Sequence, residues 1–236
     1  MSKLYFFRHA QASFGKDDYD ALSPKGEEQS LQLGKYLVAK KIVFQQVFVG
    51  PLKRQQHTFE LVKSVYDTHG VPIPKPINVE GLTEHQGPEA VEIMMPNLRE
   101  IAPFKQFIAD IQANPKRMKA NRLLIFQQFM HQWVEGKFEV EGVVAWKDFR
   151  ENVREGLHTI LTATGSGETN AAFTSGGTIS AIAAEALNIG DEKSVASLNF
   201  SIRNTSFTTF LYSKNNFNLL GLNEIPHLED QMITFV

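Results

Sequence analysis

The sequence contains no cysteine among its 236 residues. This absence excludes disulfide bonds, a thiolate nucleophile and zinc held by cysteine ligands. The chain also has no excess of charge of one sign, because 24 Lys and Arg face 26 Asp and Glu and leave a formal net charge of −2. A long-range attraction for DNA or RNA is therefore excluded, and we expect no nucleic-acid partner.

Long apolar runs are missing near the N-terminus as well. Only residues 4–7 form an apolar run before Arg8, and such a run is too short for a signal peptide or a membrane span. We therefore expect a cytoplasmic protein without membrane attachment. No internal repeat, low-complexity stretch or Gly/Ser-rich linker divides the chain, so we expect residues 1–236 to form a single domain.

The sequence does contain a regular alternation of strand and helix signals. Residues 4–7 are continuously apolar, which is typical of a strand buried on both faces. Ser23-Pro24 places a capping residue and a proline at the start of a helix. A second apolar run at residues 47–49 precedes helical spacing over residues 55–66. This alternation predicts a mostly parallel sheet in a three-layer α/β/α sandwich.

The middle of the chain has a different character. Apolar residues at helical spacing predict a helical cap inserted over residues 88–146. The other expected elements are a short strand at 77–79, a helix at 147–161, a strand at 171–174 followed by an Ala/Ile-rich helix, and a hairpin of strands 207–212 and 217–222 that turns at Asn215-Asn216.

Polar residues follow three of the expected strands. Arg8-His9 comes directly after the first strand, Arg54 shortly after the second, and the glycine-rich segment 174–178 after the strand at 171–174. Ligands of open α/β sheets bind at the carboxyl ends of the strands. Arginine donor forks and the free N–H groups of a glycine-rich helix start both suit phosphate oxygens. We therefore expect a phosphate pocket at this edge.

Several segments together carry a family pattern. They are Arg8-His9-Ala10, Leu22-Ser23-Pro24-Lys25-Gly26, Gly50-Pro51-Leu52-Lys53-Arg54, Arg203-Asn204-Thr205-Ser206, and Asn223 followed by His227-Leu228. In order and spacing, they resemble the histidine phosphatase superfamily, the phosphoglycerate-mutase-like proteins, over nearly the whole chain.

The resemblance implies roles for individual residues. His9 would be the nucleophile that accepts a phosphoryl group, and Arg8 and Arg54 would bind its oxygens. Glu84, in Leu82-Thr83-Glu84, would protonate the leaving alkoxide. The chemistry of the residues agrees, because neighbouring arginine charges favour the neutral imidazole that a nucleophile requires. No metal ion and no other cofactor would be needed.

The chain departs from the family pattern at two positions. Ala10 stands where the family usually has glycine, and Ser175 stands where a second catalytic histidine usually precedes the glycine at position 176. A serine can donate a hydrogen bond but brings no positive charge. Two interpretations stay open: a phosphomonoesterase that transfers a phosphoryl group to His9 and then to water, and a catalytically weak or inactive phosphate-binding or interaction protein of the same fold.

Further residues near the expected pocket are weaker candidates. Ser13, in the loop after His9, and Gly176, at a helix start, could contact phosphate alongside Ser175. The acidic run 17–20 lacks the spacing of a calcium loop and is expected to be a solvated turn. The alternatives to Glu84 and to the second histidine are Glu80, Glu89, His85 and His57.

The insertion holds the clearest basic cluster, made of Lys116, Arg117, Lys119 and Arg122. Such a cluster is usually a solvated helix face, but above the pocket it could attract a polyanionic substrate. We expect the partner to be a phosphorylated small molecule or a phosphoprotein. Hydrolysis is favoured over mutase activity, because no sequence feature indicates protection of a phosphoenzyme from water.

Overall fold

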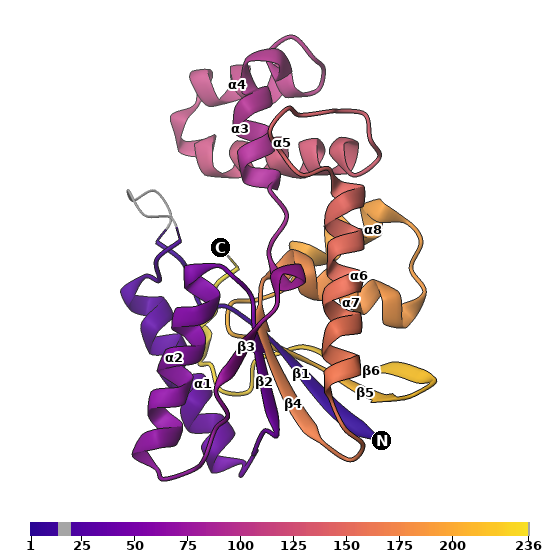
Figure 1. Cartoon of the computed structure of the whole chain (residues 1–236). Coiled ribbons are helices and arrows are strands. Elements are labelled where there is room, and N and C mark those ends of the chain that lie inside the picture. Colours follow the sequence, from indigo (N-terminus) through magenta and orange to yellow (C-terminus); the bar gives the residue numbers. More distant parts are fainter. Residues whose placement is uncertain (14–19, 236) are drawn as a thin grey trace.

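The computed structural model describes residues 1–13 and 20–235, which form a six-stranded sheet with helices on both faces (Figure 1). The strand order is β3-β2-β4-β1-β5-β6. The pairs among β1 to β4 are parallel, whereas β5 pairs antiparallel with both β1 and β6. The predicted, mostly parallel sheet is confirmed. In chain order the strands are β1 Ser2–Arg8, β2 Gln46–Val49, β3 Pro76–Asn78, β4 Thr169–Thr174, β5 Phe207–Ser213 and β6 Asn216–Glu224.

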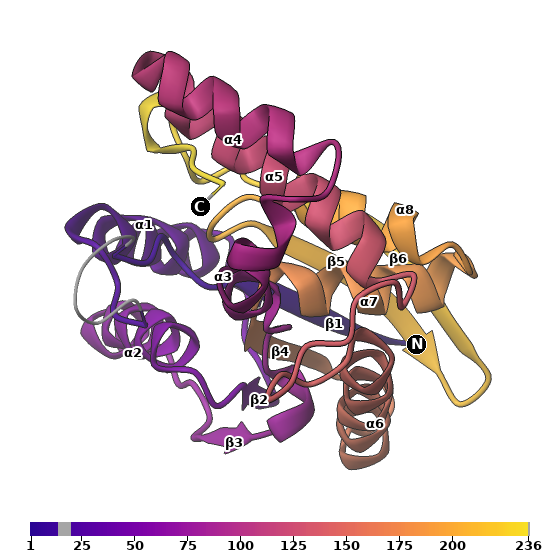
Figure 2. The same ribbon diagram turned by 90° about the horizontal axis from the view of Figure 1, so that it is seen from above.

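β1 is buried on both faces, as its unbroken apolar run predicts. Leu4 and Phe6 belong to one core cluster, and Tyr5 and Phe7 belong to the cluster on the opposite face. Burial of one such large side chain contributes roughly 1.5–3 kcal/mol to stability. The first cluster is covered by α6 (Trp146–Ala163) and α7 (Gly176–Leu187), and the second by α1 (Pro24–Ala39) and α2 (Lys53–Thr68) (Figure 2). The three-layer α/β/α arrangement is therefore confirmed.

The start of α1 follows the capping signal in the sequence. The Ser23 hydroxyl accepts a hydrogen bond from the Gly26 N–H at 3.0 Å, and Pro24 occupies the first helical position. A Cβ atom on Gly26 would lie 2.2 Å from the carbonyl oxygen of Gln11. Glycine at this position therefore lets the loop that follows His9 pack directly against α1.

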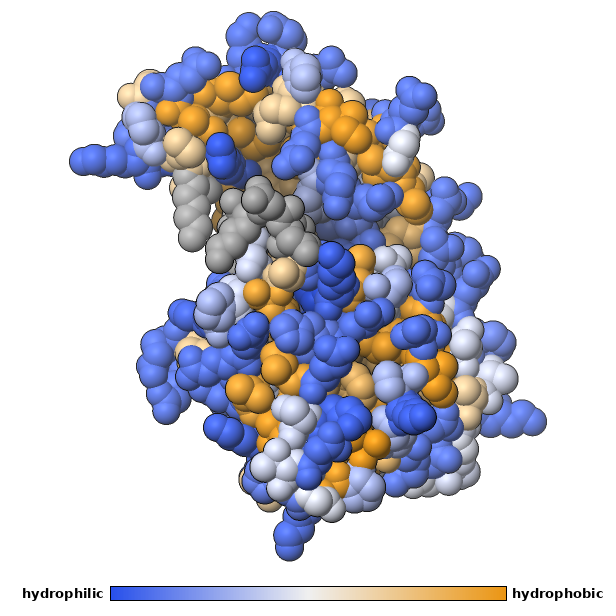
Figure 3. Space-filling model, turned by 60° about the vertical axis from the view of Figure 1, so that its left-hand side comes forward, coloured by the Kyte–Doolittle hydropathy of each residue, from blue (hydrophilic) through white to orange (hydrophobic). Residues whose placement is uncertain are grey.

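The insertion forms α3 (Gly87–Leu98), α4 (Phe104–Ala113) and α5 (Met118–Trp133). Figure 1 shows these helices beyond the end of the sheet at which the parallel strands finish. Phe104 and Phe129 are fully buried inside this cap. Figure 3 shows apolar side chains at the surface of the cap as well, and Ile93 and Leu123 are exposed. The buried side chains of the cap continue the core cluster that contains Leu4 and Phe6, and the cap surface carries apolar side chains among polar ones.

The basic cluster lies on the outside of the cap. Lys116, Arg117 and Arg122 are exposed, and Arg117 Nη1 lies 3.3 Å from a carboxylate oxygen of Asp110. The side chain of Lys119 is outside the described part of the structure. Exposure of these side chains agrees with a solvated face, and attraction of a polyanionic substrate stays a prediction.

Two local features differ from the sequence-based expectation. The hairpin turns at residues 214–215 rather than at Asn215-Asn216, because Asn216 already pairs with Ser213 as the first residue of β6. The helix α8 (Glu192–Asn199) was not expected, because its short span holds too few apolar residues to show helical spacing. None of the helices in the described ranges is long and apolar enough to cross a membrane.

The position of His227 predicts a loss of stability in acid. Its Nδ1 atom is buried without a hydrogen-bond partner among the described residues, and burial lowers the pKa of the imidazole from 6.5 to about 4. Between these two values the unfolded chain binds a proton that the folded chain does not. The free energy of unfolding should therefore fall as the pH falls below 6.5, by about 2 kcal/mol at pH 5 from this residue.

Urea unfolding of the His227→Gln variant at pH 7 and pH 5 checks this expectation. The variant should lose less stability between the two pH values than the parent protein does. His158→Gln is the matched control, because His158 is exposed on α6 and its substitution should leave the pH dependence unchanged. An equal pH dependence in the parent and in His227→Gln would contradict the assignment.

Candidate active site

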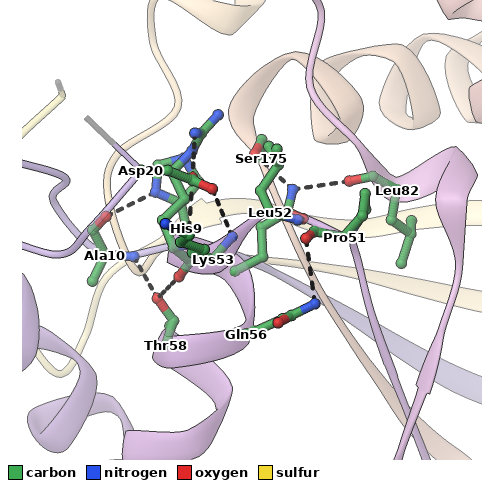
Figure 4. Close-up of polar contacts among 12 residues, drawn as sticks. His9, Ala10, Asp20, Pro51, Leu52, Lys53, Gln56, Thr58, Leu82 and Ser175 are labelled. Atoms are coloured by element: carbon green, nitrogen blue, oxygen red, sulfur yellow. Dashed lines mark hydrogen bonds and ion pairs between the residues drawn. The ribbon is translucent and has the colours of Figure 1, made fainter. Parts of the chain in front are cut away.

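Three strand ends bring polar side chains to one edge of the sheet (Figure 4). Arg8 is the last residue of β1 and His9 is the next residue in the chain. Arg54 is the second residue of α2, which follows β2, and Ser175 caps α7 directly after β4. These strands are neighbours in the sheet, so the residues that follow them meet, as predicted from their place in the sequence.

The backbone of His9 is held on two sides. Its N–H donates to the carbonyl oxygen of Thr174 at 2.8 Å, and its carbonyl oxygen accepts from the Asn204 side chain at 3.2 Å. The imidazole Nδ1 lies 2.8 Å from the carbonyl oxygen of Ala10. Because a carbonyl oxygen can only accept, Nδ1 carries the proton and Nε2 keeps its lone pair. His9 therefore has the tautomer in which Nε2 can act as a nucleophile.

The Arg54 guanidinium lies directly beside that lone pair. Its Nε–H donates to His9 Nε2 at 3.1 Å, and its Nη1 lies 2.7 Å from Oδ1 of Asp20. Only 11% of the Arg54 side chain is exposed. The ion pair fixes the direction of the guanidinium, and the guanidinium in turn covers the atom that a phosphorus atom would have to reach.

Burial and positive charge keep the His9 imidazole neutral. Burial is the largest cause that lowers the pKa of His9 well below 6.5, followed by the charges of Arg54 and Arg8. The hydrogen bond to Ala10 acts in the opposite direction but is the weakest of these effects. A neutral imidazole is the state that a nucleophile requires, so His9 is held in its reactive form at neutral and mildly acidic pH.

Arg8, the residue before His9, lies against the start of α7. Its Nη1 donates to the backbone carbonyl oxygens of Ile202 and Phe235. A Cβ atom on Gly176 would lie 3.4 Å from Arg8 Nε, so the small residue leaves room for the guanidinium beside the helix start. The first N–H groups of a helix have no acceptor within the helix and favour an anion.

The loop that carries Glu84 is fastened to β4 and α7. Thr174 Oγ1 donates to the Leu82 carbonyl oxygen at 2.7 Å, and Thr178 Oγ1 donates to the Thr83 carbonyl oxygen. The Glu84 carboxylate accepts from the Gly177 N–H at 3.0 Å. Its side chain is 16% exposed, so Glu84 lies at the site with partial access to solvent. By contrast, the two alternative carboxylates, Glu80 and Glu89, are exposed.

Ser175 is fully buried, and its hydroxyl oxygen accepts from Gln55 Nε2 at 2.8 Å. The same amide nitrogen donates to the Leu82 carbonyl oxygen at 2.9 Å, and Gln55 Oε1 accepts from the Leu52 N–H. Gln55 thus links α2, the Glu84 loop and the end of β4. No motif in the sequence points to Gln55. Direct contact between Ser175 and phosphate stays a prediction.

The remaining candidates have other positions. The Ser13 hydroxyl donates a hydrogen bond to the Leu22 carbonyl oxygen at 3.0 Å and so ties its loop to the segment before α1. His57 is partly exposed and lines a hollow of about 300 Å³ with Asp20 and Lys53. Of the acidic run, residues 17–19 lie outside the described residues, whereas Asp20 lies in a turn, is partly exposed and pairs with Arg54. Within the described ranges, no group of three or more His, Asp or Glu side chains could hold a metal ion.

Comparison with protein families gives one match. The sequence model of the histidine phosphatase superfamily, branch 1, matches residues 4–225. A comparison with curated protein sequences gives no match.

Solved structures with the same fold cover almost the whole chain. YhfR of Bacillus stearothermophilus is 19% identical, with a TM-score of 0.67 over 97% of this chain and 100% of that one. A phosphoserine phosphatase of Entamoeba histolytica, in complex with phosphoserine, is 16% identical with a TM-score of 0.63 over 97% and 100%. A mycobacterial glucosyl-3-phosphoglycerate phosphatase is 15% identical with a TM-score of 0.57 over 94% and 98%. At these identities the likeness concerns the fold.

Proposed function

The chain belongs to the histidine phosphatase superfamily, and from this membership and the geometry around His9 we propose that it is a phosphomonoesterase. His9 accepts the phosphoryl group of a phosphate monoester and then transfers it to water. The observation that carries the proposal is the state of the imidazole, which is neutral, has its proton on Nδ1, and points its Nε2 lone pair at the Arg54 guanidinium.

The first step forms a bond between Nε2 of His9 and phosphorus. Before it can form, Arg54 must transfer its Nε–H hydrogen bond from the imidazole to a phosphoryl oxygen, which frees the lone pair for attack. The bond between phosphorus and the ester oxygen breaks, and its electron pair leaves with the alcohol. Arg8 and Arg54 stabilise the negative charge on the phosphoryl oxygens, and the Ala10 carbonyl oxygen stabilises the Nδ1–H of the phosphohistidine.

Glu84 supplies the proton for the leaving alcohol. The protonated carboxyl is the form that can donate, so the reaction uses the protein with Glu84 protonated in this step. In the second step the Glu84 carboxylate takes a proton from water, the water oxygen attacks phosphorus, and the bond from phosphorus to Nε2 breaks. Inorganic phosphate leaves and His9 is neutral again.

Substitution of Glu84 by Gln should affect substrates according to their leaving groups. Hydrolysis of an alkyl phosphate should slow by about 10² to 10⁴, because its alkoxide needs a proton as it departs. An activated aryl phosphate, whose phenolate leaves unaided, should lose much less in the phosphorylation step. The ratio kcat/KM, which covers the steps up to departure of the alcohol, measures the difference on both substrates.

The matched control for this prediction is Glu89→Gln, because Glu89 is exposed on the first turn of α3. It should leave the kinetics of both substrates unchanged. Equal losses in kcat/KM for alkyl and aryl phosphates in Glu84→Gln would exclude Glu84 as the proton donor to the leaving alcohol.

The substrate class follows from the phosphoryl pocket and from the solved neighbours. A phosphoserine phosphatase and a glucosyl-3-phosphoglycerate phosphatase share the fold, which supports a phosphorylated small molecule as substrate. A second function is a phosphate-binding protein with little or no turnover. It is favoured by Ser175, whose hydroxyl is buried against Gln55 at the position of the family's second catalytic histidine.

Activity on p-nitrophenyl phosphate in the presence of EDTA separates the two functions. Turnover that disappears in a well-folded His9 variant supports the phosphomonoesterase. Binding of inorganic phosphate without turnover supports the binding protein. A panel of phosphoserine, phosphorylated sugars, nucleotides and a phosphopeptide then identifies the substrate class.

A further inference from the structure

His85 follows Glu84 in the chain and is enclosed by aromatic rings. Its side chain is only 3% exposed, and the ring centroids of Trp146 and Phe149 both lie 5.7 Å from its own. The proposed reaction gives this residue no part. Its imidazole is nevertheless held in one orientation beside the pocket. Its hydrogen bonds therefore determine how the neighbouring polar side chains are oriented.

Two contacts determine which nitrogen of the His85 ring carries the proton. The backbone N–H of Gly87 points at Nδ1 at a distance of 3.1 Å, and the side-chain amide of Asn199, placed with Nδ2 nearest, lies 2.9 Å from Nε2. A neutral imidazole has one lone pair in the ring plane and one N–H, so it cannot accept at both nitrogens. The backbone N–H cannot be exchanged for an acceptor, whereas a side-chain amide can turn by 180°. Therefore Nε2 carries the proton and Asn199 accepts it through its oxygen.

This orientation turns the amide NH₂ group of Asn199 toward the phosphate pocket. The terminal atom of the amide on that side lies 2.6 Å from the position that a Cβ atom on Gly176 would take, and Arg8 Nε lies 3.4 Å from the same position. The NH₂ group and the Arg8 guanidinium thus both lie close to the backbone of Gly176 at the start of α7. An anion bound at this point could accept hydrogen bonds from the NH₂ group and from the guanidinium.

We propose that Asn199 binds a phosphoryl oxygen of the substrate together with Arg8 and the N–H of Gly176, and that His85 is a positioning residue that fixes the Asn199 amide. The inference rests on the proposed function only for the identity of the bound phosphoryl group. It assigns a neutral hydrogen-bond donor to a pocket in which Ser175 has replaced a histidine.

Phosphate binding tests the proposal without turnover. Calorimetric titration of the full chain with inorganic phosphate should show binding about 10- to 100-fold weaker in Asn199→Asp, because a donor to a charged group is lost and a carboxylate takes its place. His85 Nε2–H can still donate to that carboxylate. The matched control is Asn218→Asp, since Asn218 is exposed on the edge strand β6 and the same change in charge should leave phosphate affinity unchanged.

The tautomer of His85 supplies a second test that does not depend on a variant. The ¹⁵N chemical shifts of the imidazole in the parent protein should show the proton on Nε2, and the side-chain NH₂ signals of Asn199 should shift when inorganic phosphate is added. The His85→Leu variant keeps Asn199 but removes the hydrogen bond that orients its amide. Phosphate binding should weaken by about three- to tenfold in this variant.

Each outcome bears on the proposal. A proton on Nδ1 of His85, or unchanged phosphate affinity in folded Asn199→Asp, would overturn it. Should the parent bind phosphate and lose that affinity in the variant but show no turnover, the phosphomonoesterase assignment fails while the Asn199 site stands. No binding of phosphate by the parent would overturn both.

Discussion

Replacement of His9 by alanine should abolish hydrolysis of phosphate monoesters, with a loss of roughly 10³-fold or more in kcat. The reason is that His9 Nε2, whose lone pair lies beside Arg54, is the atom that forms the bond to phosphorus. The fold should persist, because the backbone contacts of His9 with Thr174 and Asn204 do not involve the imidazole. Steady-state kinetics and circular dichroism measure the two effects.

The matched control is His57→Ala. His57 lies on α2, three residues after Arg54, and is partly exposed, so its removal should leave kcat unchanged. Inorganic phosphate should still bind to His9→Ala, since both arginines remain. A well-folded His9→Ala protein that keeps most of its activity would exclude His9 as the nucleophile.

The placement of Arg8, His9 and Arg54 at the strand ends could be predicted from the sequence because the signals for it are local. The apolar run of β1 determines where that strand ends, and the two residues Arg8 and His9 must then lie at the carboxyl edge of the sheet. The capping signal at Ser23 fixes the start of α1 in the same way. Such features need only neighbours in the chain, and the structure confirms the elements that they predict.

The contacts that orient the side chains could not be predicted, because they join distant parts of the chain. Gln55 bonds to Ser175 across 120 positions, and Arg54 pairs with Asp20 across 34. Asn199 belongs to α8, an element without a clear apolar pattern. Sequence spacing alone does not show which residue in a distant loop faces a given side chain, so the tautomers and ion pairs of the site follow only from the packed structure.

Arg54→Ala should slow turnover by roughly 10³-fold or more, because a charge that stabilises the transferring phosphoryl group is lost. Phosphate binding should weaken in the same variant. Arg54→Lys should restore part of the binding but little of the rate, since a lysine keeps the charge and lacks the Nε–H that lies 3.1 Å from His9 Nε2. Kinetics and phosphate titration of both variants measure these effects.

The pH profile distinguishes a role in the pocket from a role in the fold. Arg54 is one of the charges that lower the pKa of His9, so its removal moves that pKa upward, toward 6.5. The residual activity of Arg54→Ala should therefore begin to fall at a higher pH on acidification than the activity of the parent, because the protonated imidazole cannot attack phosphorus. Asp20→Asn, which loosens the guanidinium but keeps its charge, should reduce kcat less and leave the acid limb close to that of the parent. Unchanged turnover, phosphate affinity and acid limb in Arg54→Ala would together place the guanidinium outside the reaction, since a group in contact with the attacking atom must alter at least one of the three.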